Sequence, residues 1–300
     1  MEPTDEFSGR HSGPTSAEND EMHGTLGVAD KQELEDETVP ETIRLGREQT
    51  LPESVTERRL LARAAELAGK TQPSRSYLGL GYHGTLTPGV ILRNIFENPG
   101  WYTQYTPYQA EISQGRLEAL LNFQTMVIDL TGLPIANASL LDEGTAAAEA
   151  MLMLYGAHGK DDRNVFLVSE ACHPQTIAVV EGRARPIEID VKIVKHDEVD
   201  FAGLNGRVFG ALLQYPTTEG AVFDYSGFCE EMHAHGGGVI VAADLLALAL
   251  LVPPGEFGAD IAVGNSQRFG VPMGYGGPHA AYLAVSDAFK RKIPGRIIGV

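Results

Sequence analysis

From Asn137 onward the chain alternates short apolar segments with segments of helical character, and this alternation limits the possible fold more than any other feature. It predicts helices at 144–157, 174–183 and 225–235, and strands at 165–168, 187–194, 208–214, 239–243, 261–263 and 280–285. Several of these strands are apolar at every position, as is typical of strands covered on both faces. An α/β fold with a mainly parallel sheet and helices on both faces is therefore expected.

Residues 1 to 73 differ from this region and are expected to form a helical N-terminal arm. Two capping boxes are predicted there, at Thr15…Glu18 and Ser54…Glu57, in which a hydroxyl and a carboxylate pair with free N–H groups at a helix start. Residues 74–300 are expected to form one large domain, with the arm wrapping around its outside.

A second helical block is expected between the arm and the alternating region. One helix is predicted to begin at Thr87-Pro88, because proline is tolerated at the first helical position, and to end at Pro99-Gly100. A longer helix is predicted from the spacing of apolar residues between Leu117 and Leu130, and it ends at Gly132.

The composition disfavours several classes of protein. The formal net charge is −17, which argues against binding to nucleic acid or to anionic membranes. The longest apolar run, 239–254, is interrupted by Asp244 and is too short for a membrane span. The acidic, polar start of the chain resembles neither a secretory signal nor a transit peptide, so a cytoplasmic location is expected.

The cysteines and histidines predict no metal site. Cys172 and Cys229 are the two cysteines of the chain and form no disulfide framework. Cys229, His233 and His235 lie on what is predicted to be an ordinary amphipathic helix, and no fourth ligand follows nearby in sequence.

The segment 79–84 fits the pattern G-x-G-x-x-G, which is typical of dinucleotide-binding folds. That fingerprint requires a strand directly before it and a helix directly after it. Polar residues 71–76 come before this segment, and 85–88 follow it without opening a helix. No acidic residue ends a strand at the distance that ribose binding needs. The sequence therefore argues against NAD binding.

Polar residues gather after three of the predicted strands and at one helix start. They are 170–174, Asp244, 264–268 and, at the helix start, 142–146. Ligands of doubly wound sheets collect beyond the carboxyl ends of the strands. The free N–H groups of a helix start offer a seat for a phosphate. A ligand site is therefore expected where these four segments meet.

This set of residues resembles the pyridoxal-phosphate (PLP) enzymes of fold type I. In those enzymes a helix start holds the phosphate, an aromatic residue stacks on the ring, an aspartate pairs with the ring nitrogen, and a lysine forms an imine with the cofactor. Thr145, His173 and Asp244 stand at the first three positions. Gln267 stands at the lysine position, and its amide cannot form an imine. The resemblance thus implies a degenerate cofactor site.

Each of these residues also has a purely structural interpretation. His173 precedes Pro174 and is equally explained as a helix cap. Asp244 is explained by hydrogen bonds to backbone amides, and Thr145 by an ordinary helix start. Gln267 lies on the surface if the register is shifted.

Five longer strings resemble the glycine cleavage system P-protein family. They are 10–14, 102–109, 111–124, 137–149 and 267–279. The resemblance runs from about Phe7 to Val300. It implies a PLP-transferase-like large domain of fold type I.

The resemblance also implies a function. Members of this family decarboxylate glycine with PLP and pass the aminomethyl group to the lipoyl arm of H-protein. They have two homologous halves, fused or as two subunits, and the C-terminal half carries the PLP lysine. Gln267 makes this chain similar to the lysine-less N-terminal half. The chain is thus expected to be a fragment, or subunit 1, cut before the small domain, and to form no covalent bond with PLP.

Three functions remain open at this point. The chain is part of a glycine decarboxylase active site, an interaction module that stabilises the catalytic half and docks H-protein, or a complete PLP enzyme with another lysine. No lysine ends a strand at the expected distance after Asp244, which disfavours the third function. Tyr105, Tyr108 and Gln109 lie in a loop rich in Tyr, Pro and Gln, which is typical of a pocket or an interface with the other half.

Overall fold

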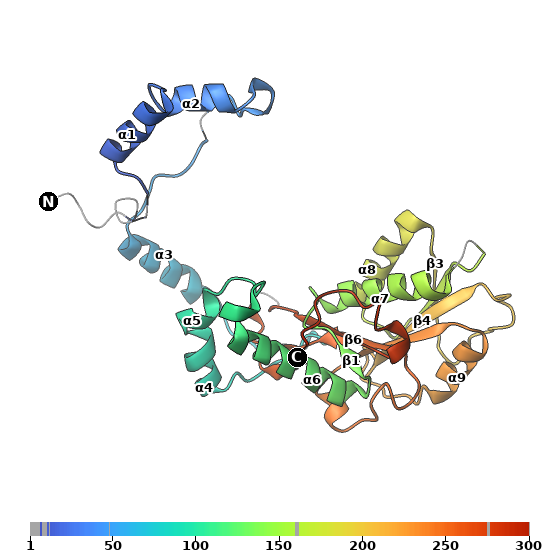
Figure 1. Ribbon diagram of the computed structural model, residues 1–300. Coiled ribbons are helices and arrows are strands. Elements are labelled where there is room, and N and C mark those ends of the chain that lie inside the picture. The colour runs from blue at the N-terminus through green and yellow to red at the C-terminus, as the bar shows by residue number, and fades with distance from the viewer. Residues whose placement is uncertain are drawn as a thin grey trace. The chain divides into compact units, whose positions relative to one another are not determined.

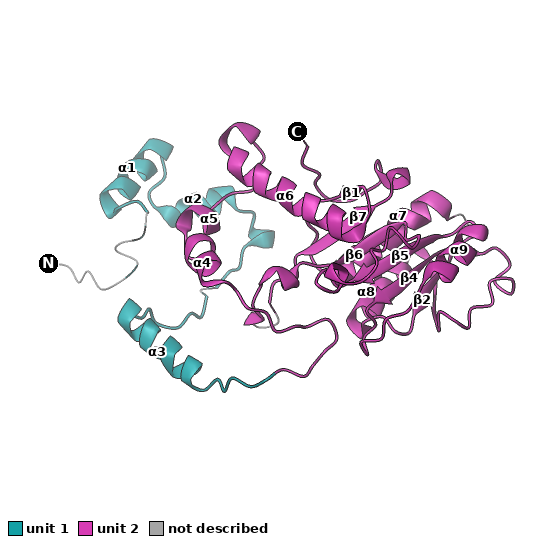
Figure 2. Cartoon of the chain, turned by 90° about the horizontal axis from the view of Figure 1, so that it is seen from below, with its two compact units in different colours: residues 1–75 teal, residues 76–300 magenta. Residues whose placement is uncertain are grey.

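The chain forms two compact units, which are described separately. Figure 1 shows the computed structural model, which describes residues 7, 11, 13–47, 49–159, 162–274 and 277–299. Residues 1–75 form the first unit and residues 76–300 the second (Figure 2). This boundary lies close to the one expected at residue 73. The position of the first unit outside the second stays a prediction.

The first unit is helical. It contains α1 (Ser16–Leu26), α2 (Lys31–Thr38), the 3-10 turn η2 (Glu41–Ile43) and α3 (Glu57–Gly69). The capping box at Thr15 is confirmed, because the Glu18 carboxylate accepts from the Thr15 N–H at 2.7 Å and the Thr15 hydroxyl accepts from the Glu18 N–H at 3.3 Å. Val28 is the single buried apolar residue among the described residues of this unit, which therefore has no core of its own.

The second predicted capping box is wrong. Thr56, rather than Ser54, is the N-cap of α3, and its hydroxyl accepts from the Arg59 N–H at 3.3 Å. Both residues carry a hydroxyl that suits a cap, and the helix begins directly after the second of them.

The second unit opens with short helical turns and one long helix. These are α4 (Gly89–Ile91), the π-helical turn η3 (Leu92–Phe96), α5 (Pro99–Tyr102), the 3-10 turn η4 (Ala110–Ile112) and α6 (Gln114–Thr131). The predicted end at Pro99 is wrong, because Pro99 begins α5 after an Asn98 cap. The predicted end of the long helix is confirmed: Gly132 adopts the left-handed conformation, with φ 67°.

Seven strands form the sheet of the second unit, in the order β1-β7-β6-β5-β4-β2-β3. Their bounds are β1 (Ile135–Ala136), β2 (Val165–Ser169), β3 (Asp190–Val194), β4 (Val208–Tyr215), β5 (Gly238–Ala243), β6 (Ile261–Asn265) and β7 (Ala281–Val285). Strands β3, β2, β4, β5 and β6 pair in parallel, whereas β7 is antiparallel to β6 and to β1. The predicted α/β fold with a mainly parallel sheet is confirmed.

Helices cover both faces of this sheet (Figure 1). They are α7 (Glu143–His158), α8 (Pro174–Ala184), α9 (Ser226–Ala234) and α6, joined by the 3-10 turns η5 (Arg185–Ile187), η6 (Ala247–Ala249), η7 (Gln267–Phe269) and η9 (Asp287–Phe289). Alternate residues of each strand enter two separate cores, one shared with α7 and α8 and the other with α6 and α9. Strands β2, β4 and β5 are buried at every position, which explains their continuous apolar sequence.

Strand β3 begins later than the sequence predicts. Residues 185–187 continue from α8 as a 3-10 turn, and Glu188 adopts a left-handed conformation with φ 59°. The strand then begins at Asp190 instead of Ile187. No helix among the described residues is long and apolar enough to cross a membrane.

Gly264 offers a test of how tightly β6 packs. A Cβ atom there would lie 2.4 Å from the Ala243 carbonyl oxygen and 2.5 Å from the Tyr282 ring. We expect Gly264→Ala to lower the free energy of unfolding by about 2 kcal/mol, because the backbone oxygen cannot rotate away. Gly156→Ala on α7 is the control, since open space surrounds that position, and it should raise the free energy of unfolding by about 0.5 kcal/mol. Equal urea midpoints for the two variants would contradict this packing.

Candidate functional site

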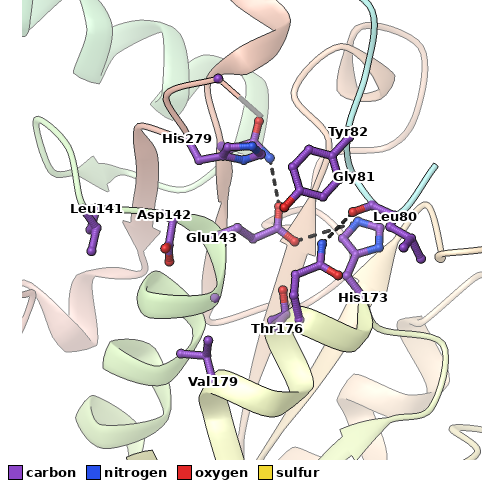
Figure 3. A pocket seen from close by; sticks show the side chains of 14 residues that line it. Leu80, Gly81, Tyr82, Leu141, Asp142, Glu143, His173, Thr176, Val179 and His279 are labelled. Carbon is purple, nitrogen blue, oxygen red and sulfur yellow. Dashed lines mark hydrogen bonds and ion pairs between the residues drawn. The ribbon is translucent and has the colours of Figure 1, made fainter. Parts of the chain in front are cut away.

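Two adjoining cavities lie beyond the carboxyl ends of β2, β4, β5 and β6. Their volumes are about 390 and 250 Å³, and both are lined by Leu80, Gly81, Glu143, His173 and Asn265. Figure 3 shows the first cavity, where side chains from the start of α7, the start of α8 and the segment 80–82 point toward one another. The structure therefore brings together the strand ends that the sequence singles out.

The start of α7 is capped by a carboxylate. Asp142 is the N-cap residue, and its Oδ1 accepts from the Thr145 N–H at 2.7 Å. Asp142, Glu143 and Gly144 line the first cavity, whereas Thr145 lines neither cavity. The N–H group that the sequence assigns to a phosphate is thus already bonded to an acidic side chain.

His173 lies between the two cavities with 7% of its surface exposed. It occupies the N-cap position of α8 but makes no capping hydrogen bond with its side chain. Its Nδ1 is 3.0 Å from Thr218 Oγ1, and its Nε2 is 4.0 Å from a carboxylate oxygen of Glu143. Burial lowers the pKa of His173 to about 4, assisted by His83, so the ring is neutral near pH 7.

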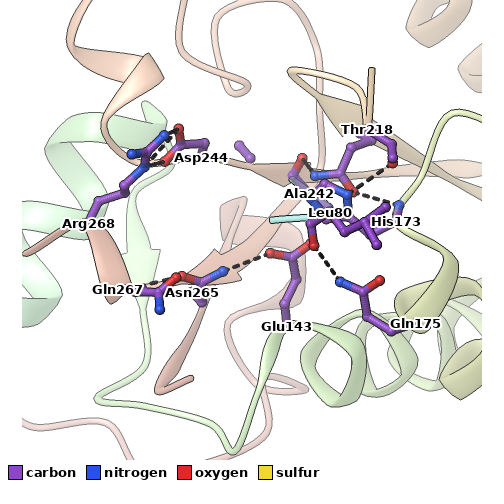
Figure 4. A network of polar contacts seen from close by, with 12 residues as sticks. Leu80, Glu143, His173, Gln175, Thr218, Ala242, Asp244, Asn265, Gln267 and Arg268 are labelled. Atoms are coloured by element: carbon purple, nitrogen blue, oxygen red, sulfur yellow. Dashed lines mark hydrogen bonds and ion pairs between the residues drawn. The ribbon is translucent and has the colours of Figure 1, made fainter. Parts of the chain in front are cut away.

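Asp244 is paired with Arg268 by a forked ion pair (Figure 4). Arg268 Nη2 donates to Oδ2 at 2.9 Å, and Nε lies 3.1 and 3.2 Å from the two carboxylate oxygens. Oδ1 also accepts from the Leu246 N–H at 3.2 Å. The carboxylate that the sequence assigns to a ring nitrogen is therefore bonded to this chain's own groups.

Gln267 is fully buried and is the first residue of η7, two residues after the end of β6. Its Oε1 accepts from the His83 N–H at 3.4 Å. Its Nε2 has no hydrogen-bond partner in the part of the chain that the structure describes. The alternative of a surface position for Gln267 is wrong, because the segment 83–87 packs against residues 267–271.

Glu143 is a site residue that the sequence analysis did not identify. It is 9% exposed, and its Oε2 accepts from Asn265 Nδ2 at 3.2 Å. Its Oε1 has no hydrogen-bond partner among the described residues. Burial raises the pKa of Glu143 to about 7, and the amides of Asn265 and Gln214 lower it only in part. Gln214 lies close to this carboxylate, but its Nε2 donates to the Ala242 carbonyl at 3.1 Å.

The glycine-rich segment 79–84 lines both cavities and was missed as part of the site. Gly79, Leu80 and Gly81 have positive φ values of 62°, 57° and 82°. Gln175 Nε2 donates to the Leu80 carbonyl at 2.6 Å, which holds the segment over the start of α8. A Cβ atom at Gly81 would lie 2.8 Å from His173 Nε2, so only a glycine permits this close approach.

Tyr105, Tyr108 and Gln109 lie apart from the two cavities, on the loop between α5 and η4. Tyr105 is 79% exposed and Tyr108 is 71% exposed. Their rings contact each other edge to face, with centroids 5.8 Å apart. Arg116 donates a hydrogen bond to the Tyr105 carbonyl and thereby ties the loop to α6.

The residues considered for a metal site are engaged elsewhere. Cys229 is buried in the core, and His233 Nε2 lies 2.8 Å from Asp260 Oδ2. His235 Nδ1 faces the Glu231 carbonyl at 2.9 Å. Among the described residues, no group of three or more His, Cys, Asp or Glu side chains is placed to hold a metal ion.

The residues of the two cavities do not fit PLP. Gln267 offers no amine, and Asp244 is already paired with Arg268. The Asp142 carboxylate occupies the helix start at which a phosphate would sit, and a second acid, Glu143, follows it. Like charges disfavour a phosphate at this position.

The ring position of the cofactor is also obstructed. Gly81 packs against the His173 ring, on which a pyridine would have to stack. The mismatch with PLP therefore extends beyond the missing lysine to the charge and the shape of the site.

Comparison with known proteins identifies relatives along almost the whole chain. The family model described as glycine cleavage system P-protein matches residues 9–300. The glycine dehydrogenase (decarboxylating) of Nostoc sp. is 58% identical over 294 residues, which are 98% of this chain and 30% of that protein. The mitochondrial enzyme of the same name from Flaveria anomala is 54% identical over 302 residues, covering 100% of this chain and 29% of the relative.

One solved structure also resembles the chain over almost its whole length. It is the crystal structure of glycine decarboxylase (P-protein) of the glycine cleavage system in an inhibitor-bound form, with a TM-score of 0.86 and 36% identity. The match covers 96% of this chain and 65% of that one. The chain thus spans about 30% of the length of the curated relatives it matches.

The buried carboxylate predicts how stability depends on pH. The pKa of Glu143 rises on folding from 4.5 to about 7. The neutral form of Glu143 therefore stabilises the folded chain fully below pH 4.5, the pKa in the unfolded chain, and this stabilisation is lost as the pH rises through 7. This loss amounts to about 3 kcal/mol. We expect Glu143→Gln to reduce the fall in unfolding free energy between about pH 5 and about pH 8 by an amount of this order.

Urea unfolding of the chain at both pH values measures this difference. Glu149→Gln is the matched control, because Glu149 lies on the same helix and is partly exposed beside Arg183. If Glu143→Gln and Glu149→Gln leave the same pH dependence as the unmodified chain, Glu143 does not titrate as described.

Proposed function

The chain belongs to the glycine cleavage system P-protein family, and we propose that it is the lysine-less, N-terminal half of a PLP-dependent glycine decarboxylase. The complete enzyme would convert glycine and the lipoyl group of H-protein to aminomethyl-lipoyl H-protein and CO₂. The observation that carries the proposal is the match over residues 9–300 to a family whose members are about three times as long.

The cofactor in this proposal is bound through a lysine of the C-terminal half, fused or as subunit 2. Two features of the chain support this division of work. Gln267 is buried at the lysine position, and its amide offers no amine for an imine with the cofactor. Arg268 pairs with Asp244, so this carboxylate is not available to keep a pyridine nitrogen protonated. PLP supplies an electron sink when it is bound. This chain would instead contribute a surface that contacts the catalytic half and helps to shape its active site.

The surface proposed to face the catalytic half is the loop 102–114. Four of its large apolar or aromatic side chains are more than half exposed, and such exposed apolar patches mark surfaces that contact a partner. They are Tyr102, Tyr105, Tyr108 and Ile112. A tyrosine hydroxyl both donates and accepts hydrogen bonds, so it is suited to orient groups of a neighbouring pocket. We place the contact with the C-terminal half, and the contribution to its glycine site, on this loop.

The first unit is proposed to act as an arm, separate from a large PLP-transferase-like domain at 74–300. It lacks a core, and Leu60, Leu61 and Leu67 of α3 are each at least half exposed. A helix with such a face is stabilised by packing against another surface. A cytoplasmic location and the docking of lipoylated H-protein remain predictions.

A second candidate function is that of an interaction module that stabilises the catalytic half without shaping its active site. The contacts within the site favour this second function, because Arg268 occupies Asp244 and Asp142 occupies the Thr145 N–H, so neither group is available to a cofactor. The two functions differ in what the loop tyrosines do. Only the first requires their hydroxyl groups for turnover.

The tyrosine hydroxyls are therefore tested in the complete enzyme. We expect the double variant Tyr105→Phe/Tyr108→Phe to lower kcat/KM for glycine decarboxylation by roughly tenfold, because hydroxyl groups that orient a substrate would be lost. Tyr77→Phe is the control, since Tyr77 is 87% exposed and lies outside the loop. Size-exclusion chromatography checks that the two halves remain associated.

Unchanged turnover in the double variant, with the assembly intact, would overturn the first function. It would leave the interaction module as the better account.

A further inference from the structure

The unpaired oxygen of Glu143 distinguishes the two cavities from a site in which every polar group is paired within the chain. A buried carboxylate oxygen is almost always hydrogen-bonded, because desolvation without a partner is costly. Glu143 lines both cavities, and among the described residues its Oε2 accepts from Asn265 whereas its Oε1 has no hydrogen-bond partner. In Figure 3 its carboxylate projects between Tyr82 and His173 into the space that these residues surround. The site is therefore built around an acceptor that lacks its donor.

The charge around this acceptor selects a positive ligand. Among the described residues, three carboxylates line the cavities, on Asp142, Glu143 and Asp244, and only Asp244 pairs with a Lys or Arg, namely Arg268. His173 adds no positive charge near pH 7, because its pKa is lowered to about 4. An anion would meet uncompensated carboxylates at the start of α7. A cation would meet an attractive field in these partly open cavities.

The shape and lining of the first cavity favour an organic cation over a metal ion. Tyr82 and His279 line it with their rings in edge contact, the centroids 5.0 Å apart. Alkylammonium groups bind well against aromatic rings. No group of three or more metal-ligating side chains was found among the described residues. Volumes of about 390 and 250 Å³ admit a small organic molecule.

We propose that the two cavities form a binding site for a small organic cation with a protonated amine, whose N–H donates to Glu143 Oε1. This site lies in the half that holds no cofactor, and it does not depend on the glycine reaction. Its occupant would act on the enzyme as an effector.

Binding is expected to release a proton, because a bound cation keeps the Glu143 carboxylate ionised. The groups that face this carboxylate are Asp142 on α7, Cys172 and His173 before α8, Asp244 after β5, and His279 and Tyr282 at β7. Of these, Asp142 and Asp244 raise the pKa of Glu143. Arg268 pairs with Asp244, whereas no cation among the described residues pairs with Asp142. With a pKa of about 7, Glu143 is half protonated at pH 7, so about half a proton should be released there.

The test uses isothermal titration calorimetry on the complete protein, with the C-terminal half present. Trimethylammonium is the probe, because a tertiary amine has one N–H donor and cannot form an imine with PLP in the other half. Tetramethylammonium is the matched probe without an N–H donor. We expect trimethylammonium to bind, and tetramethylammonium to bind at least about tenfold more weakly.

The matched variants are Glu143→Gln and Glu149→Gln, both on α7. Glu143→Gln should weaken trimethylammonium binding at least about tenfold, and Glu149→Gln should leave it unchanged. Titrations in two buffers of different ionisation enthalpy count the protons released by the unmodified protein, which keeps the test valid if Glu143→Gln does not fold.

Any one of the following results would overturn the proposal. They are the absence of trimethylammonium binding, equal binding of both probes, and binding that releases no proton or survives Glu143→Gln in a folded variant. Displacement of the probe by sodium or potassium at equal concentration would also overturn it, because the site would then take an inorganic cation.

Discussion

The parallel pairing of β2, β4, β5 and β6 is the constraint on which the rest of the second unit depends. Parallel strands with helices on both faces must end at one edge, so the segments that follow them are forced together. The strands are buried along almost their whole length, and their polar residues, Ser169, Gln214 and Asn265, stand at or next to their carboxyl ends. The start of α7 and the segment 79–84 close the space that remains.

Groups of the chain itself occupy much of this edge. Arg268 pairs with the carboxylate of Asp244, Asp142 accepts from the Thr145 N–H at the start of α7, and Gly81 packs against the His173 ring. Each contact replaces one that a PLP enzyme makes with its cofactor. Among the described residues of the site, Glu143 Oε1 and Gln267 Nε2 are buried without a hydrogen-bond partner. Of these two residues only Glu143 lines the cavities, so the site is suited to bind a ligand that donates to its free oxygen.

Much of the fold could be predicted from the sequence, because continuous apolar runs such as 239–243 have few other places to lie. The start of β3 could not, since the left-handed turn at Glu188 follows from how α8 ends. The positions of His173, Asp244 and Gln267 follow from strand order. Glu143 could not be found, because an acid after a helix cap normally lies in solvent. In the folded chain it lines the same cavity as residues 80–82, which lie about 60 positions earlier in the sequence.

The central claim is that charge and packing, and not the absent lysine alone, exclude PLP from this half. The direct measurement introduces Gln267→Lys into the complete protein, adds PLP, reduces with borohydride and maps the labelled lysines by mass spectrometry. We predict that the label appears in the C-terminal half and that residue 267 stays unlabelled, because Arg268 and Asp142 remain in place. Stoichiometric labelling of the lysine introduced at position 267 would contradict the account.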